Sequence, residues 1–379
     1  MAGFLNALRR DLEAPIEARG FGTGWFAGFF ALLLAFVGLG MVLALRYPGL
    51  LSTPELMAVK DWEGFRPLIH VVILASYALA LLSLLLRPRK ALGFTALALA
   101  LVAGLLGGSG AEAREVHDWG IFFGLDFFVL NLVLSGLLFA PIERFFPRHP
   151  GQRLFRTEWR EDLFYYLVSS MMVQALTFLA FAPSRAVLSH SGGWDGFRAL
   201  VGSQPLVVQV IEIMLLTDFV QYWFHRAFHR VPALWNFHAV HHSAKAMDWL
   251  AGARMHFVEI VALRGVTAIP MMTLGYTPTA LQIYIGLVYV YSSLLHANLR
   301  GDFDRLGQWL ATPRFHHWHH GLEKEAIDVN FAIHFPFWDR LFGTFHFPAG
   351  RWPNGYGVPD EVPHGYVAQF FHPFRRRRG

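Results

Sequence analysis

Histidine is concentrated in one part of this chain, and its spacing there is typical of metal ligands. Thirteen of the 19 histidines lie between positions 225 and 346. His225 and His229 are four residues apart, which places both imidazoles on one face of a helix. The pattern His-x2-His-His occurs twice, at His238, His241 and His242 and again at His316, His319 and His320. Eight imidazoles packed so closely would repel one another on protonation, so the spacing predicts metal ligation.

The number of clustered imidazoles predicts more than one metal ion. Zinc takes four ligands, and octahedral iron takes at most about six, so two neighbouring ions are the natural interpretation. Imidazole suits iron, copper and zinc, so the spacing does not choose the metal. The chain has no cysteine, which excludes thiolate ligands and a cysteine nucleophile. His317 points off the face that its neighbours use, and it is predicted to be a supporting or surface residue.

Four further residues are candidates for the same site. His296 follows an apolar stretch that returns the chain to this face, and it is predicted to be a ligand. His256 is a weaker candidate ligand, and Glu259, three residues later, is predicted to hold its ring. Asp218 lies two turns before His225 in an apolar segment, where a carboxylate is functional by default. It would support a ligand, or form a structural hydrogen bond to a neighbouring helix.

The elements that position these residues are predicted to be membrane helices. The 379 residues are 54% hydrophobic and 16% charged, which excludes both an ordinary soluble globule and a disordered chain. Six apolar segments have the length of a bilayer crossing, at about 21–47, 67–86, 91–107, 119–141, 163–184 and 204–224. Two shorter stretches, 257–275 and 279–296, are separated by Gly275 and Pro278 and predict a helical hairpin that enters and leaves on one side. The predicted fold is all-α: a polytopic transmembrane bundle in which residues 225–256 and 297–379, which contain the histidine motifs, share one face.

Charge patterning sets the expected orientation and partners. Basic residues are more numerous in the segments on the side of the amino terminus, which places that side in the cytoplasm. Arginine far outnumbers lysine, and alanine and glycine are abundant, so a bacterial cytoplasmic membrane is the expected location. The net charge of +5 is explained by basic residues at membrane edges, without a nucleic-acid partner. The arginine-rich segment 144–160 would either dock an acidic electron carrier or only fix the topology. The arginines at 375–378 would contact anionic headgroups or form a solvated tail.

The histidine motifs and their flanks resemble those of one family. His225-x3-His229 and the two His-x2-His-His motifs are similar to the eight-histidine pattern of the fatty acid hydroxylase / sterol desaturase superfamily. Segments 234–238 and 312–316 resemble the lead-ins to its second and third motifs, and 328–345 is similar in style to its alkylglycerol monooxygenase branch. The resemblance covers roughly 116–350. It implies that Asn330, in the last of these segments, belongs to the catalytic set beside Asp218 and Glu259.

The resemblance implies an integral membrane oxygenase with two iron ions, in which a cytosolic helical cap on the transmembrane bundle holds the dimetal site. Such an enzyme uses O2 and externally supplied electrons to hydroxylate a lipid such as a fatty acyl, sterol or alkyl ether lipid. A lipid desaturase is the alternative reaction, and a histidine-rich metal transporter or a zinc-structured membrane protein is the non-enzymatic alternative. No flavin or haem-carrier motif is visible, so a separate reductase or electron-carrier protein is the expected partner. The oligomeric state stays open.

The expected domain organisation has three parts. Residues 1–107 form a three-span membrane region outside the resemblance, residues 116–350 the catalytic domain, and residues 351–379 a basic tail. The expected metal ligands are ten histidines: His225, His229, His238, His241, His242, His256, His296, His316, His319 and His320.

Overall fold

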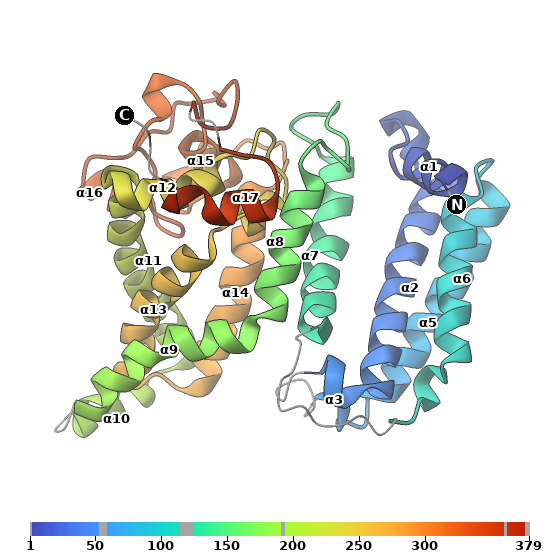
Figure 1. The fold of residues 1–379 in the computed structure, drawn as a ribbon, viewed down its shortest axis with the longest axis horizontal. Coiled ribbons are helices and arrows are strands. Elements are labelled where there is room, and N and C mark those ends of the chain that lie inside the picture. Colours follow the sequence, from blue (N-terminus) through green and yellow to red (C-terminus); the bar gives the residue numbers. More distant parts are fainter. Residues whose placement is uncertain (1, 53–58, 114–124, 191–193, 360–361, 376–379) are drawn as a thin grey trace. The chain divides into compact units, whose positions relative to one another are not determined.

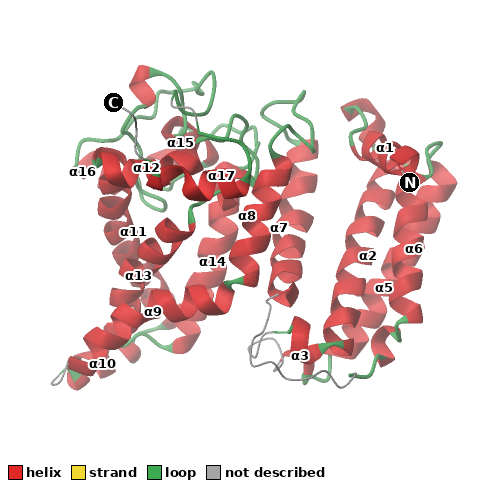
Figure 2. Ribbon diagram, in the orientation of Figure 1, coloured by secondary structure: helices red, strands yellow, loops and turns green. Residues whose placement is uncertain are grey.

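The structure is a computed structural model that describes residues 2–52, 59–113, 125–190, 194–359 and 362–375. Helices connected by loops make up these residues, and no strand occurs among them (Figure 2). Only two isolated β-bridges, Pro147 with Leu299 and Gly321 with Tyr356, join segments in that part of the chain. The predicted all-α class is therefore confirmed. The chain divides into two compact units, which are described separately: an amino-terminal unit (1–145, 150–155 and 170–174) and a histidine unit (146–149, 156–169 and 175–379).

The amino-terminal unit is a bundle of apolar helices. Its helices are α1 (Ala2–Leu12), α2 (Trp25–Arg46), α3 (Pro48–Leu51), α5 (Phe65–Leu86), α6 (Ala91–Leu105) and α7 (Leu125–Phe145), with short 3-10 turns at Ile16–Arg19, Phe21–Thr23 and Gly108–Gly110. Helix α2 packs against both α5 and α6. Gly28 permits this approach, because a Cβ atom there would lie 2.4 Å from the Ser83 Oγ and 2.9 Å from the Leu92 Cβ. At one end of the bundle, the buried Arg87 Nε donates to the Asp11 carboxylate at 2.6 Å.

The histidine unit contains the remaining helices, apart from residues 170–174 at the junction of α8 and α9. They are α8 (Trp159–Met171), α9 (Val173–His190), α10 (Asp195–Gly202), α11 (Leu206–Arg230), α12 (Pro232–His242), α13 (Phe257–Thr273), α14 (Pro278–His296), α15 (Pro313–His319), α16 (Phe337–Leu341) and α17 (Tyr366–Phe371). Short 3-10 turns lie at Ala251–Ala253, Leu306–Gln308, Lys324–Ala326 and His372–Phe374. Helices α11, α13 and α14 pack together, and the short helices α12, α15 and α17 gather at one end of them (Figure 1).

Three helices that carry histidines begin with the same local signal. Helices α12, α14 and α15 each have proline in the first helical position, where the missing N–H is not needed and the fixed φ suits a helix. Thr277 caps α14 by accepting from the Ala280 N–H at 3.3 Å, and Thr312 caps α15 by accepting from the Phe315 N–H at 3.4 Å. The position at which each helix begins determines which of its turns directs imidazoles toward the other helices.

Five described helices are long and apolar enough to cross a membrane: α2, α5, α6 with its 3-10 extension, α11 and α14. The chain is therefore a multi-pass integral membrane protein. The predicted span 119–141 lies partly outside the described residues. The predicted hairpin corresponds to α13 and α14, with Gly275 at a φ of +96° in the turn between them, but α14 is long enough to cross a bilayer by itself.

The predicted single span 163–184 is divided in the structure. Helix α8 ends at Met171 and α9 begins at Val173, and the two run in different directions (Figure 1). Ser169 explains a bend at this point, because its hydroxyl donates to the Tyr165 carbonyl at 2.9 Å. Such bonds compete with the helical hydrogen bonds and bend apolar helices. A hydropathy window does not detect this change of direction.

Candidate metal centre

Nine imidazoles converge in the histidine unit and form two groups. The first group is His225, His229, His238, His242 and His319; the second is His241, His296, His316 and His320. Within each group, one ring nitrogen from every member lies within 4.8 Å of the others. The members come from four helices, α11, α12, α14 and α15, with His320 directly after α15, and all but His229 are buried. We call these the five-histidine group and the four-histidine group.

In the five-histidine group, ring nitrogens without a proton face one another. His225 donates its Nδ1–H to the Phe331 carbonyl at 2.9 Å, and His238 directs its Nδ1 at the Glu259 carboxylate at 2.5 Å. A neutral imidazole carries one proton, so the Nε2 atoms of both rings are then unprotonated. These two Nε2 atoms lie 3.0 Å apart, and the Nε2 of His242 is 3.1 Å from that of His238. A cation between such nitrogens would replace lone-pair repulsion with coordination.

The four-histidine group has the same arrangement. His241 donates its Nδ1–H to the Arg254 carbonyl at 2.9 Å, and His296 donates its Nδ1–H to the Ser292 carbonyl at 2.8 Å. Their Nε2 atoms lie 3.4 Å apart, and the Nε2 of His316 lies 3.1 Å from that of His296. The residues present therefore fit a metal ion in each group, since the inward nitrogens are free of protons and fixed in direction.

The two groups are neighbours. The rings of His242 and His320, one from each group, are stacked with their centroids 4.3 Å apart. The rings of His238 and His241 lie 5.3 Å apart, and so do those of His316 and His319. The repeated His-x2-His-His spacing explains this pairing, because each motif contributes residues to both groups. Two ions held here would act as one dinuclear site.

Burial keeps the imidazoles of the short helices neutral. Loss of solvent lowers the pKa of each ring well below its ordinary value, and the neighbouring imidazoles lower it further. This applies to His238, His241, His242, His316, His319 and His320. Several ring nitrogens also have no hydrogen-bond partner although they are buried: Nε2 of His229 and His319, and Nδ1 of His316 and His320. Neutral, unpartnered imidazole nitrogens are the form that binds a metal.

Glu259 belongs to the site but not beside the residue predicted for it. The sequence suggested that Glu259 holds the ring of His256, whereas its carboxylate contacts His238. His256 instead caps α13: its Nδ1 accepts from the Val258 N–H at 3.1 Å, and its Nε2 donates to the Phe370 carbonyl at 2.9 Å. Both ring nitrogens are occupied, and His256 lies outside both histidine groups. The three-residue spacing placed Glu259 near His256 along the chain, but the packing of α12 on α13 brings it to His238.

Asp218 anchors the segment that follows the third histidine motif. Its carboxylate, fully buried in α11, accepts from the backbone N–H groups of Ile333 at 2.8 Å and Phe335 at 2.7 Å, and from that of His334 at 3.2 Å. It does not contact a histidine of either group directly. Asp218 therefore positions the chain next to Phe331, whose carbonyl holds His225.

Asn330 has a similar positioning role. Its side-chain nitrogen donates to the carbonyls of Phe315 at 2.9 Å and His346 at 2.7 Å, and its oxygen accepts from the His346 N–H at 2.8 Å. Its φ is +58°, a conformation that asparagine tolerates better than most residues. Asn330 thus ties the residue before the third motif to the loop after α16, and it does not point at the histidine groups.

His317 faces away from both groups, as predicted. Its Nδ1 pairs with the Tyr356 hydroxyl at 2.8 Å, and its Nε2 donates to the His296 carbonyl at 3.3 Å. Burial lowers its pKa to about 3. His317 therefore supports the end of α14 where His296 lies.

A buried charge network beneath α12 was not predicted. Asp162, on α8, accepts from the Arg254 Nε at 2.5 Å and from a terminal nitrogen of Arg156. Arg156 also bonds both carboxylate oxygens of Asp248, at 2.6 and 2.9 Å, and Arg254 reaches Glu158 at 3.2 Å. The backbone carbonyl of Arg254 is the acceptor that orients His241. No short motif reveals this network, because its bonded partners are up to 96 residues apart in the sequence.

The network also changes the interpretation of segment 144–160. This segment was predicted either to dock an acidic carrier or only to fix the topology, and its Arg156 is buried and bonded to the carboxylates of Asp248 and Asp162. Arg144, in the amino-terminal unit, is also buried. Arg153 and Arg160 remain exposed. A docking surface there would therefore have fewer charges than the sequence suggests.

The helical membrane fold and the paired histidine groups define an integral membrane protein in which two adjacent histidine groups fit metal ions. Residues 210–344 match the model of the fatty acid hydroxylase family, so the chain contains a domain of that family. This stretch includes all nine clustered histidines, together with Asp218, Glu259 and Asn330. No solved structure was found to match the chain.

Curated relatives share the same region. An ornithine lipid hydroxylase from Rhizobium tropici is 32% identical over 174 residues, which is 46% of this chain and 52% of that protein. Alkylglycerol monooxygenases are 33% identical over 128 residues in Xenopus tropicalis, covering 34% of this chain and 28% of the relative, and 29% identical over 157 residues in Homo sapiens, covering 41% and 35%. The chain thus spans about half the length of the first relative and less of the others.

Proposed function

We propose that this protein is a membrane-bound di-iron oxygenase that hydroxylates a membrane lipid. The observation that carries the proposal is the pair of adjacent histidine groups whose unprotonated Nε2 atoms face one another at 3.0–3.4 Å. The ligands we propose are the nine members of the two groups. His256, although expected from the sequence, is left out because both of its ring nitrogens have other partners.

Iron fits this donor set better than the alternatives when the family is considered. Imidazole binds iron, copper and zinc, but the domain matches a fatty acid hydroxylase model, and the relatives carry the names of hydroxylases and monooxygenases. A transporter would need ligands distributed along a path through the membrane, whereas the nine imidazoles form one buried cluster where α12 and α15 meet the ends of α11 and α14.

Bound iron supplies the reductive activation of O2 that hydroxylation of an unactivated C–H bond requires. The balanced reaction consumes the lipid, O2, two electrons and two protons, and it yields the hydroxylated lipid and water. The chain's residues hold the ions in fixed positions: Glu259 and the carbonyls of Phe331, Arg254 and Ser292 fix the imidazole tautomers. Burial of the imidazoles excludes water, which protects a reactive oxidant from side reactions.

The proposed substrate is a bilayer lipid with an acyl or alkyl chain. Ornithine lipid and alkylglycerol, the substrate names of the relatives, share this amphiphilic form. The electrons would come from a separate reductase or electron-carrier protein. The expected location is a bacterial cytoplasmic membrane with the histidine groups on the cytoplasmic face, on the basis of the loop charges.

Incorporation of labelled oxygen tests the proposal. Purified protein in lipid nanodiscs, loaded with iron and supplied with a chemical or enzymatic reductant under 18O2, is expected to add one 18O atom to a lipid. Lipid mass spectrometry would detect this product. His238→Ala is expected to abolish it, whereas His70→Ala, which changes an exposed histidine on α5, is expected to leave it unchanged.

Two outcomes would contradict hydroxylation. A lipid that loses two hydrogens without gaining 18O would indicate desaturation at the same site. Equal metal content and equal product in the His238→Ala and unmodified proteins would overturn the assignment of the site itself.

A further inference from the structure

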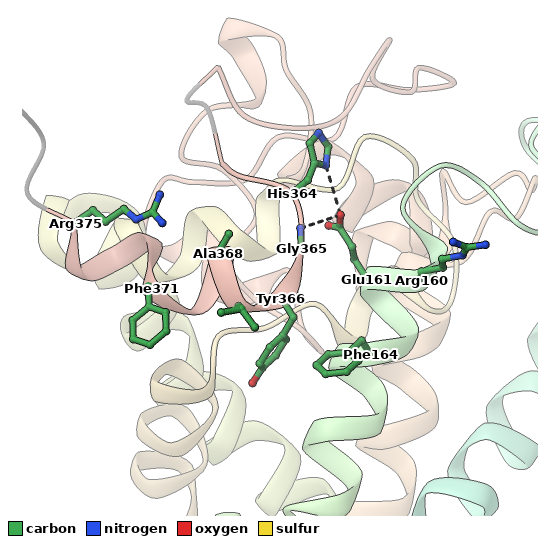
Figure 3. Close-up of a pocket in the computed structure, with 10 residues that line it drawn as sticks. Arg160, Glu161, Phe164, His364, Gly365, Tyr366, Ala368, Phe371 and Arg375 are labelled. Carbon is green, nitrogen blue, oxygen red and sulfur yellow. Dashed lines mark hydrogen bonds and ion pairs between the residues drawn. The ribbon is translucent and has the colours of Figure 1, made fainter.

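A groove lies between α8 and α17, away from the histidine groups. It encloses about 630 Å³ and is lined mainly by apolar side chains. Phe164 of α8 and Tyr366, Val367 and Phe371 of α17 form its apolar part (Figure 3). None of these residues belongs to the histidine groups, so a role of this groove would be separate from the proposed metal chemistry.

Helix α17 is fixed in place rather than being a loose tail. Glu161 of α8 accepts from the Gly365 N–H and from the Gln369 side chain, both at 3.1 Å. On the other side, the Phe370 carbonyl accepts from His256 at 2.9 Å. Gly365 makes the entry turn possible, with a φ of +87°. The groove is therefore a formed feature of the histidine unit.

Several apolar side chains of α17 and of the residues beside it are exposed. The exposed fraction is 67% for Val367, 53% for Phe371, 57% for Phe374 and 44% for Phe164. Figure 3 shows the rings of Phe164, Tyr366 and Phe371 on one side of α17, with His364 on the opposite side. Contiguous apolar surface of this kind marks an interaction site, because leaving it in water has a free-energy cost.

The position of α17 points to a membrane surface. The helix lies across the ends of the long helices, at the end where α12 and α15 carry histidines (Figure 1). A short helix placed there, with apolar side chains exposed on one side and Gln369 buried against Glu161, has the arrangement of an interfacial helix. Its apolar side chains would enter the bilayer boundary rather than water.

Two cations flank the groove. Arg160 lines one end and Arg375 the other, and both side chains are exposed. Among the described residues, neither guanidinium has a carboxylate partner. Glu161, the one acidic residue among the described residues that line the groove, contacts Gly365, Gln369 and His364. The sequence continues after Arg375 with three more arginines. The net charge that the groove offers to a ligand is positive.

We propose that this groove binds an anionic phospholipid of the surrounding bilayer. An acyl chain would lie along Phe164, Tyr366 and Phe371, and headgroup phosphates would contact Arg160 at one end of the groove and Arg375 at the other. This contact would hold α17 at the membrane surface and, through the bond from His256 to Phe370, would fix the start of α13. The inference is independent of the proposed hydroxylase function.

A depth measurement tests the location of the groove. Because the chain has no cysteine, a single Val367→Cys substitution in the full-length protein provides one site for a bimane fluorophore. In nanodiscs that contain phosphatidylglycerol, lipids brominated on the acyl chain are expected to quench this label, and aqueous iodide is not. Lys324→Cys, exposed elsewhere in the same unit, is the matched control and is expected to show the reverse.

A binding measurement tests the charges. The double variant Arg160→Gln/Arg375→Gln is expected to bind phosphatidylglycerol about thirtyfold more weakly in native mass spectrometry, as expected for two basic residues near an anionic surface. Arg351→Gln, an exposed arginine elsewhere in this unit, is the control and is expected to have no effect. Circular dichroism checks that each variant retains its helices.

Three results would overturn the proposal. Quenching of the Val367 label by iodide and not by brominated lipid would place the groove in water. Protection from both quenchers would indicate that a second copy of the chain covers it. Unchanged phosphatidylglycerol binding by the double arginine variant would show that the cations do not select the lipid.

Discussion

At the residue scale, the hydrogen bond at the Nδ1 of a clustered imidazole determines whether its Nε2 is free to bind a metal. Backbone carbonyls accept the Nδ1 proton of His225, His241 and His296, and the Nε2 atoms are thereby left with lone pairs. His238 differs, because a carboxylate, Glu259, faces its Nδ1 at 2.5 Å. A carboxylate partner makes an imidazole a more basic ligand than a carbonyl does. Glu259 is therefore expected to strengthen metal binding through His238.

Substitution of Glu259 measures this contribution. Glu259→Leu is expected to weaken metal affinity by about 10- to 100-fold, because His238 loses the group that orients its ring. Glu259→Gln is expected to have a smaller effect, since an amide oxygen still accepts from Nδ1. Metal titration of the detergent-purified protein provides the measurement, with the exposed Glu325→Gln as control. Unchanged affinity in Glu259→Leu would remove Glu259 from the site.

Gly252 provides a second test at the residue scale. A Cβ atom at this position would lie 2.8 Å from the His296 Nδ1 and 3.1 Å from its Cγ. Gly252→Ala is therefore expected to displace the His296 ring and to reduce metal content, with the loss in the four-histidine group. Gly286→Ala is the matched control, because nothing lies within 4 Å of a Cβ there and alanine favours the helix. Equal metal content in the two variants would contradict the close approach.

The pH at which metal is released follows from the same burial. Protons compete with a metal for each imidazole nitrogen, and burial lowers the pKa of His238, His241 and His320 well below 6.5. The imidazoles therefore stay unprotonated as the pH falls through 6.5, and the midpoint of metal release is expected below that value. Elemental analysis after equilibration at a series of pH values provides the measurement. Complete release by pH 6.5 would indicate solvent-exposed ligands instead.

Short spacings in the sequence were sufficient to find the histidines but not their partners. The four-residue spacing of His225 and His229 predicts the observed neighbours, whose ring centroids lie 5.2 Å apart. The assignment of Glu259 to His256 was wrong, because the contact with His238 depends on how α13 packs. His334 was not among the predicted site residues, yet it is fully buried, and loss of solvent lowers its pKa to about 4. These contacts are set by tertiary packing, which a one-dimensional pattern does not contain.

At the element scale, the network of Asp162, Arg156 and Arg254 connects α8 to the loop that carries the His241 acceptor. Asp162 bonds both arginines, and its side chain has no exposed surface. Removing one member of a buried charge set leaves the others uncompensated, which costs far more than the intact set contributes. The network is therefore expected to stabilise the packing of α8 and α12 against the loop that contains Arg254.

Asp162→Asn is expected to destabilise the protein by about 3–5 kcal/mol, because two buried guanidinium groups lose their shared carboxylate. Arg351→Ala, which breaks the exposed pair with Glu325, is expected to cost at most about 1 kcal/mol. Thermal unfolding of both variants in the same detergent provides the comparison. Equal unfolding midpoints of the two variants would show that the network does not contribute to the stability of the fold.

Element boundaries were predictable where apolar length or a proline start marked them. The long runs of α2, α5 and α11 and the turn before Pro278 were evident from hydropathy and from proline and glycine. The division of 163–184 into α8 and α9 was not, because the Ser169 hydroxyl acts on the helix geometry and leaves hydropathy nearly unchanged. The short helices α15, α16 and α17 were also not predicted, because a search for apolar segments of membrane length does not detect helices this short.

At the scale of the whole molecule, the candidate metal centre lies in one of two compact units. All nine clustered histidines and the residues that orient them lie in the histidine unit, whereas the amino-terminal unit supplies membrane helices. The division into 1–107, 116–350 and 351–379 remains a prediction. Composition predicts the multi-pass membrane character, and the histidine motifs predict the metal site, because both are properties of the sequence itself.

The metal content of the intact protein tests the central claim most directly. Elemental analysis combined with Mössbauer spectroscopy of anaerobically purified protein is expected to give about two irons per chain, magnetically coupled to each other, because the two histidine groups are adjacent. One metal ion per chain, or zinc in both groups of a protein that is inactive with iron, would contradict the account.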